Sequence, residues 1–175
     1  MIAISINPDI WNLVSGHLLQ TSSEKEQAAF LFGRYEPDQS AIRIIDQQLM
    51  TDDDFVSQRN DYLELRDPTR AHLIKRAHTQ HACLIEIHSH PGALRAAFSS
   101  FGLHGLEETV RHMQWRLHGQ PYVAIVVAGD TYDALVWNIA AREPCALHAI
   151  NVGPRTLSPT NLSLGRWKGI KNESV

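Results

Sequence analysis

Residues 83–92 read Cys-Leu-Ile-Glu-Ile-His-Ser-His-Pro-Gly and carry the strongest structural signal in this chain. The mainly apolar run from Cys83 to Ile87 predicts a buried strand. Side chains two residues apart on a strand face the same way, so His88 and His90 project side by side from its end. The Pro91-Gly92 pair then stops the strand, which leaves both imidazoles at a strand end where a cleft can open. Two such imidazoles can share one metal ion.

The chain upstream of this strand alternates between extended and helical patterns. Asn7 can cap a helix and Pro8 suits its first turn, while residues 28–33 read as a buried strand that ends at a glycine. The elements predicted before residue 83 are, in order, a strand at 2–6, a helix beginning at Asn7-Pro8, strands at 28–33 and 42–49, a loop at 51–54, a short strand at 62–65 and a helix at 67–79.

Downstream of the histidines, the apolar residues recur at helical spacing between Leu106 and Leu117 and predict an amphipathic helix. Gly129-Asp130 lies between two apolar runs, 122–128 and 132–139, and predicts a β-hairpin. Periodicity is lost after this hairpin. We therefore expect one domain over residues 1–140. The C-terminal extension, residues 141–175, should hold one strand near 147–152 and then be loosely ordered.

The composition excludes several classes of protein. The 175 residues are 43% hydrophobic and 20% charged, which is enough to bury one ordinary domain core. A net charge of −3 provides no electrostatic reason to expect nucleic acid or an anionic membrane as partner. Only Cys83 and Cys145 are present, which argues against a disulfide framework. No apolar run approaches membrane-spanning length, and no signal-like start is present, so we expect a soluble cytoplasmic protein.

The histidine pair and its surroundings resemble the JAMM motif of the JAB/MPN domain family, written as Glu, His-x-His and Ser-x-x-Asp. Glu26 precedes an apolar strand ending in glycine, as the glutamate of that family does, and His88 and His90 match the His-x-His pair. Ser99 follows Phe98 and precedes a predicted helix, which matches the position of the serine. The resemblance covers roughly residues 2–139.

This resemblance implies an α/β fold of the MPN (JAB) type, in which a mixed, curved β-sheet is flanked by helices with cytidine-deaminase-like layering. It also implies Zn²⁺ as the cofactor. In the family the histidines and the aspartate hold zinc with a water molecule, the glutamate takes a proton from that water, and the serine helps to stabilise the oxyanion. His88 and His90 are accordingly the expected metal ligands, and Glu26 and Ser99 the expected catalytic residues.

The sequence departs from the motif at one ligand. Gly102 stands at the position of the expected aspartate, and the spacing from His90 to Ser99 is one residue longer than the common form. Three explanations are open: another side chain supplies the third ligand, Gly102 is an engineered loss of that ligand, or the chain is a naturally inactive member of the family. The candidate substitutes are His104 as the first choice, then Glu86, Glu107 and Glu108.

The activity implied by the resemblance is hydrolysis of a peptide or isopeptide bond at the C-terminus of a ubiquitin-like protein. The compact chain is more similar to prokaryotic JAB peptidases than to eukaryotic complex subunits. The expected partners are therefore a ubiquitin-like protein or its conjugate, together with proteins of a ubiquitin-like conjugation system. Two alternatives use the same fold: a catalytically inactive binding or scaffold protein, and an amidase that acts on a small metabolite.

Overall fold

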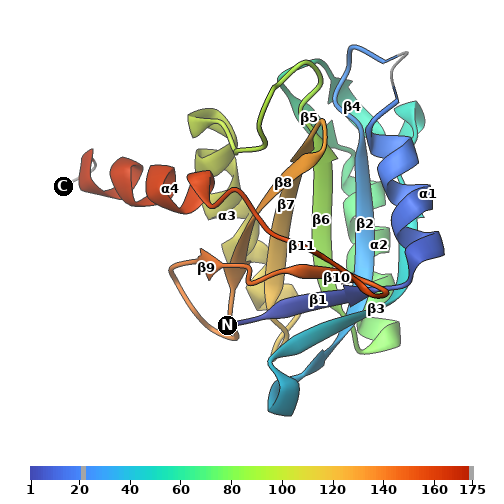
Figure 1. The fold of residues 1–175 in the computed structure, drawn as a ribbon, viewed down its shortest axis with the longest axis vertical. Helices are drawn as coiled ribbons and strands as arrows, with labels where there is room; N and C mark the ends of the chain where they lie inside the picture. Colours follow the sequence, from blue (N-terminus) through green and yellow to red (C-terminus); the bar gives the residue numbers. More distant parts are fainter. Residues whose placement is uncertain (21–22, 174–175) are drawn as a thin grey trace.

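A strongly curled mixed sheet of nine strands, flanked by helices, forms the centre of the computed structural model, which describes residues 1–20 and 23–173 (Figure 1). The strands of this sheet are β1 (Ala3–Ile6), β2 (Ala28–Glu36), β3 (Ala41–Leu49), β6 (Cys83–Ser89), β7 (Tyr122–Ala128), β8 (Thr131–Trp137), β9 (Cys145–Ala146), β10 (Ile150–Val152) and β11 (Arg155–Leu157). Their spatial order is β11-β10-β1-β3-β2-β6-β7-β8-β9. Strand β1 is parallel to both of its neighbours, and β6 is parallel to β7.

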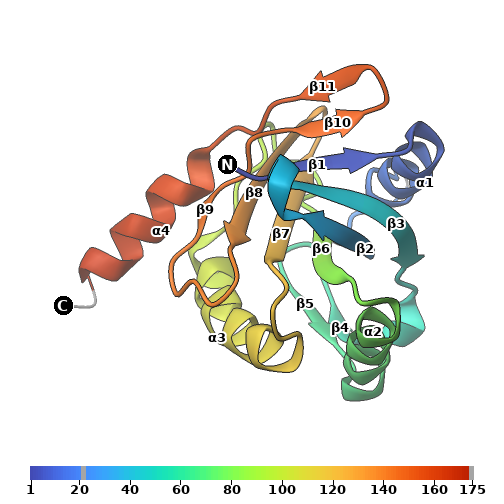
Figure 2. The same ribbon diagram turned by 90° about the horizontal axis from the view of Figure 1, so that it is seen from below.

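A two-stranded hairpin lies apart from the sheet and consists of β4 (Phe55–Gln58) and β5 (Leu63–Leu65). The helices of the described chain are α1 (Pro8–Leu18), α2 (Asp67–Gln80), α3 (Ser100–Arg116) and α4 (Leu162–Glu173), with short 3₁₀ turns η1 (Pro37–Gln39) and η2 (Asp52–Asp54). In Figure 2, α2 and α3 lie along one side of the sheet, whereas α1 lies along the other.

Alternation along the strands builds a separate core on each face of the sheet. Phe30 and Phe32 of β2 belong to the core beneath α2 and α3, whereas Ala29 and Leu31 belong to the core that α1 helps to close. Val14 of α1 is fully buried there. Side chains of a strand alternate between its two faces, so a strand buried on both sides reads as a continuous apolar run.

The predicted class, a mixed, curved α/β sheet flanked by helices, is confirmed, and most elements lie where the sequence placed them. Strand β6 extends to Ser89, two residues beyond its predicted end. Helix α3 begins at Ser100, six residues before the predicted helical pattern, because Ser99 caps it by accepting a hydrogen bond from the Gly102 backbone N–H (3.0 Å).

The C-terminal region is far more ordered than predicted. Instead of one strand and a loose tail, it forms β9, β10, β11 and helix α4, and β10 pairs in parallel with β1. Trp167 of α4 is buried, and its ring meets that of Trp137 edge-on with centroids 5.4 Å apart. Helical periodicity did not reveal α4 because Gly165 and Gly169 interrupt it and few of its residues are apolar.

A buried carboxylate holds the start of α4 against the sheet. Asp133 of β8 accepts hydrogen bonds from the backbone N–H groups of Asn161 (3.0 Å) and Ser163 (2.7 Å), which would otherwise lack partners at the beginning of a helix. The Ser163 hydroxyl in turn accepts from the Phe98 backbone N–H, and Arg166 donates to the Phe98 carbonyl. The tail therefore fixes the loop that leads into α3.

Gly33 is required by a close approach between β2 and β3. The register of the two strands shifts between Phe32 and Gly33, and a Cβ at Gly33 would overlap Cγ2 of Ile42. We expect Gly33→Ala to lower the free energy of unfolding by about 1–3 kcal/mol, the usual effect of overpacking. Urea unfolding checks this. Gly165→Ala is the control, because a Cβ there meets nothing within 4 Å and alanine favours a helix.

Asp133→Asn should destabilise the protein. Each carboxylate oxygen of Asp133 accepts a hydrogen bond from one backbone N–H, of Asn161 or of Ser163, whereas the side-chain amide of asparagine has only one oxygen. One backbone N–H then faces an NH₂ group, and leaving such a buried donor unsatisfied costs about 1–3 kcal/mol. The control is Asp130→Asn, which removes the same charge from an exposed turn. Equal unfolding free energies for the two variants would contradict the capping role of Asp133.

Candidate metal centre

The candidate metal centre lies where β6 ends and β2 begins. These strands are antiparallel, with His88 opposite Ala28, and the Ser89 backbone N–H donates to the Gln27 carbonyl (2.9 Å). The Gln27 N–H donates to the Ser89 hydroxyl (2.9 Å), which continues the contact past the end of the ladder. This register places Glu26, just before β2, beside His90, although 64 residues separate them in the chain.

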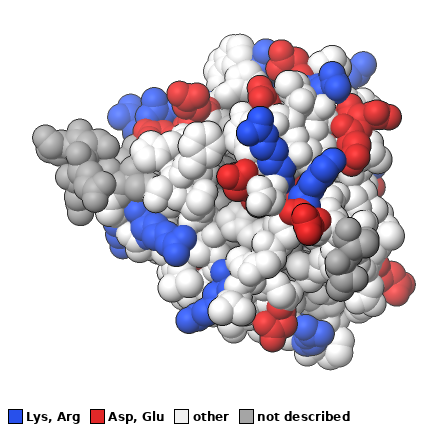
Figure 3. All heavy atoms as spheres, turned by 90° about the horizontal axis from the view of Figure 1, so that it is seen from above, with Lys and Arg blue, Asp and Glu red and all other residues white. Residues whose placement is uncertain are grey.

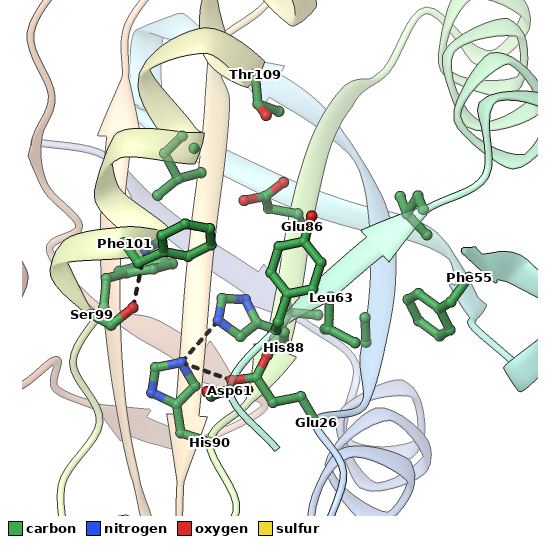
Figure 4. A pocket seen from close by; sticks show the side chains of 18 of the residues that line it. Glu26, Phe55, Asp61, Leu63, Glu86, His88, His90, Ser99, Phe101 and Thr109 are labelled. Atoms are coloured by element: carbon green, nitrogen blue, oxygen red, sulfur yellow. Dashed lines mark hydrogen bonds and ion pairs between the residues drawn. The ribbon is translucent and has the colours of Figure 1, made fainter. Parts of the chain in front are cut away.

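Three side chains converge there: Glu26, His88 and His90 (Figure 4). Nε2 of His88 lies 3.2 Å from Nε2 of His90, and Nε2 of His90 lies 3.3 Å from Oε1 of Glu26. All three ligand atoms lie within 4.8 Å of one another. These side chains thus form a group that could hold a metal ion.

The spacing of these atoms suits a small tetrahedral cation. Bonds of about 2.0–2.1 Å, which zinc makes to imidazole nitrogen and carboxylate oxygen, place two tetrahedral ligands about 3.3 Å apart. The His88–His90 and His90–Glu26 distances both match this edge length. The two histidines therefore fit a zinc ion in donor type and spacing, and Glu26 lies close enough to act either as a ligand or as a base beside the metal.

Burial keeps the two imidazoles neutral. It lowers the pKa of His88 to about 3, with a further contribution from neighbouring His90, and it also lowers the pKa of His90. A neutral imidazole retains the lone pair that a metal needs. Surrounding groups orient the rings: Phe98 meets His88 with centroids 5.4 Å apart, and His90 hydrogen-bonds to the Ala97 backbone.

The Glu26 carboxyl is poised between its two protonation states. Burial raises its pKa from 4.5 to about 7, and the negative charge of Asp61 adds to the rise. Its side chain is only 6% exposed. A carboxyl group with a pKa near neutrality can both accept and return a proton, which is the property required of a general base that later acts as an acid.

A pocket of about 210 Å³ opens beside the group and has largely apolar walls. These walls include Phe30, Phe55, Leu63, Leu65, Phe98 and Met113. At its deeper end lies Glu86, which accepts a hydrogen bond from the Tyr122 hydroxyl (2.5 Å), and burial raises the pKa of Glu86 to about 7. The group therefore stands at the wall of an apolar pocket with a second carboxyl group farther in.

Ser99 and Gly102 line this pocket, but His104 does not. The Ser99 hydroxyl accepts from the Gly102 N–H, and a Cβ at Gly102 would lie 3.3 Å from that oxygen. His104 is exposed, and its Nδ1 lies 2.7 Å from the Ser100 carbonyl oxygen. The structure thus brings Glu26, His88 and His90 together, places Ser99 and Gly102 on the pocket wall, and leaves His104 outside.

The other substitute ligands considered from the sequence also lie apart from the group. Glu86 lines the pocket but is engaged by Tyr122. Glu107 forms an ion pair with Arg111 (2.6 Å), and neither Glu107 nor Glu108 lines the pocket. None of these carboxylates belongs to the group formed by the histidines and Glu26.

Sequence reasoning missed Asp61, an acid on the wall of the same pocket. It lies in the turn between β4 and β5, which is tied to Glu26: the Glu26 N–H donates to the Arg59 carbonyl (2.8 Å), and the Gln58 amide donates to the Glu26 carbonyl (2.8 Å). The Asn60-Asp61 pair is a turn signal, but nothing in the sequence shows that this turn reaches Glu26.

Figure 3 shows the molecule from above, the side on which the turn between β4 and β5 lies in Figure 1. Basic side chains are interspersed with acidic ones there, and much of the described surface in this view is uncharged.

No helix in residues 1–20 and 23–173 combines the length and apolar character needed to cross a membrane.

No protein-family model matches the chain, and no curated protein matches it.

Excess Zn²⁺ should stabilise the protein because the metal binds the folded group and not the dispersed ligands of the unfolded chain. A concentration 100 times the dissociation constant would add about 2.7 kcal/mol to the free energy of unfolding. Thermal unfolding with and without Zn²⁺ measures this. His88→Ala should abolish the zinc-dependent increase in Tm, whereas His104→Ala should retain it. An increase that survives His88→Ala would place the metal elsewhere.

Proposed function

We propose that this chain is a zinc-dependent metallopeptidase or isopeptidase of the JAB/MPN type. The observation that carries the proposal is the Glu26 carboxylate 3.3 Å from Nε2 of His90, in one group with His88. Two neutral imidazoles beside a buried carboxyl group with a pKa near 7 are the components of a metal-assisted hydrolase. The resemblance of Glu26, His88, His90 and Ser99 to the JAMM motif supports the same assignment.

Each residue has a defined part in this hydrolysis. A bound zinc ion supplies Lewis-acid chemistry and lowers the pKa of water to about 7. His88 and His90 would hold the ion. Glu26 takes a proton from the attacking water and returns it to the leaving amine. Ser99 accepts a hydrogen bond from Gly102, which leaves its own hydroxyl hydrogen to donate to the oxyanion that develops on the carbonyl.

The proposed substrate is the C-terminal tail of a ubiquitin-like protein, joined to another protein by a peptide or isopeptide bond. This choice of substrate rests on the resemblance to compact JAB peptidases. On the same basis we propose that the protein acts with a ubiquitin-like conjugation system in the cytoplasm. A pocket of about 210 Å³ admits a few residues of an extended chain and excludes a folded domain. A flexible tail is therefore a suitable substrate for this site.

One observation favours a second candidate function. Gly102 offers no side chain at the position where the motif supplies its third ligand, although a Cβ there would contact only Ser99 Oγ and Phe98 within 4 Å. A chain that binds no metal could still use the pocket to hold a ubiquitin-like tail. In that case the protein would be a binding or scaffold protein rather than an enzyme.

Glu26→Gln separates these functions. The amide cannot take up a proton, so hydrolysis should fall by at least about 100-fold, within the range that general-base catalysis contributes. The measurement is release of a fluorophore from the C-terminus of a panel of ubiquitin-like proteins. Zinc content, measured in parallel by elemental analysis, should stay near that of the unmodified protein.

The matched control is His104→Ala, which should leave hydrolysis unchanged because His104 lies outside the pocket. A protein that holds no zinc and cleaves none of the panel, with no change on Gly102→Asp, would overturn the enzyme and support the binding function.

A further inference from the structure

We infer that Asp61, on the turn between β4 and β5, is the third protein ligand of the metal and takes the place of the side chain missing at position 102. This inference rests on the proposed metallopeptidase function and deepens it, because it leaves Glu26 available for proton transfer. The assigned ligand set is two histidines and one aspartate, similar in kind to the two-histidine, one-carboxylate sets of other zinc peptidases.

The need for a third ligand follows from the chemistry of the group. Catalytic zinc takes three protein ligands and keeps a fourth position for water. If Glu26 completed the set, the carboxylate best suited to move a proton would be bound to the metal. The wall contributed by α3 offers no replacement, since its pocket-lining residues carry no imidazole, thiol or carboxyl group. These residues are Phe101, Gly102, Gly105, Leu106, Thr109 and Met113.

The rest of the pocket lining offers two carboxyl groups besides Glu26, and only one of them is available. Glu86 lies at the deeper end, where the Tyr122 hydroxyl donates to it at 2.5 Å. Asp61 is an exposed residue that lines the same pocket. Its side chain has no hydrogen-bond or ion-pair partner among the described residues. An unpaired aspartate on a turn can change rotamer at little cost, whereas Glu86 would first have to give up Tyr122.

The turn that carries Asp61 is held over the metal group from both sides. On one side Glu26 is hydrogen-bonded to Arg59 and Gln58, and the Arg59 N–H donates to the Tyr62 carbonyl (2.8 Å) to close the turn. On the other side the Tyr62 ring contacts the Phe101 ring of α3, with centroids 5.7 Å apart. The backbone of the turn is therefore anchored at the mouth of the pocket, next to Glu26, whereas the exposed Asp61 side chain lies outside the 4.8 Å group and must rotate to reach the metal.

The charges favour a cation at this place. Asp61 and Glu26 line the same pocket, so the carboxylate of Asp61 adds negative charge beside the metal group. Figure 4 shows Asp61 near Glu26 and His90, which line the same pocket. Two neighbouring carboxylates repel each other, and a divalent cation bound by Asp61 and the two neutral imidazoles would offset that repulsion.

Zinc affinity of the full chain tests the inference directly. The affinity is measured by competition with a chromophoric chelator, and the coordination by the visible absorption of the Co²⁺-substituted protein. Asp61→Asn should weaken Zn²⁺ binding by at least about 100-fold, since loss of residues that only support ligands already costs about 10- to 100-fold. The cobalt band should also shift, because one anionic oxygen ligand is lost.

Asp53→Asn is the matched control. It removes the same charge from an exposed position in η2, just before the same hairpin, and Asp53 does not line the pocket. This variant should bind Zn²⁺ as the unmodified protein does. In the Asp61→Asn background, Gly102→Asp should restore the affinity, because it supplies a carboxylate from the opposite wall. The gain from Gly102→Asp should be larger in this background than in the unmodified chain, because the two carboxylates fill the same coordination position, and equal gains in both would contradict the inference.

The outcomes distinguish this inference from the proposed function. Tight Zn²⁺ binding that Asp61→Asn leaves unchanged and Glu26→Gln abolishes would overturn the role of Asp61 and make Glu26 the ligand, while the metal site itself would stand. Equal weakening by Asp61→Asn and Asp53→Asn would reduce the effect to general electrostatics and overturn the inference. An unmodified chain that binds no Zn²⁺ would overturn both proposals.

Discussion

The antiparallel register between β2 and β6 is the constraint on which the site depends. Because His88 lies opposite Ala28, the residues just before β2 must lie beside those just after β6. The mutual hydrogen bonds of Gln27 and Ser89 continue this pairing to the edge of the sheet. A slip of one residue would turn both histidines to the opposite face, away from Glu26 and from the pocket. Packing of the two cores opposes that slip.

That register also explains how much of the site could be predicted. The apolar runs that become β2 and β6 are visible in the sequence, and His-Ser-His at the end of one run with Glu26 before the other has the form of a known motif. Asp61 had no such signal, because its place depends on a turn anchored to the Glu26 backbone. Local pattern identifies a strand end, whereas a turn is positioned by contacts distant in the sequence.

The C-terminal region shows that prediction of the fold from local sequence has the same limit. Its composition is typical of a loose tail, yet Asp133 and Trp137, both on β8, provide a buried cap and an aromatic partner for α4. Neither feature is visible in the tail alone. This order also affects the site, because Ser163 accepts a hydrogen bond from the Phe98 N–H and Arg166 donates one to the Phe98 carbonyl. Phe98 in turn contacts His88, so residues far from the motif help to orient a candidate metal ligand.

The two walls of the pocket differ in how firmly they are held, and this bears on metal affinity. Ser99 and Gly102 belong to the capped first turn of α3, so a ligand at position 102 would be preorganised. Asp61 belongs to an exposed turn of a two-stranded hairpin outside the main sheet. The backbone of that turn is anchored to Glu26, but the exposed Asp61 side chain would have to be ordered on binding a metal, and the ordering free energy would subtract from binding. The proposed ligand on the hairpin would therefore bind the metal less tightly than a preorganised ligand on α3.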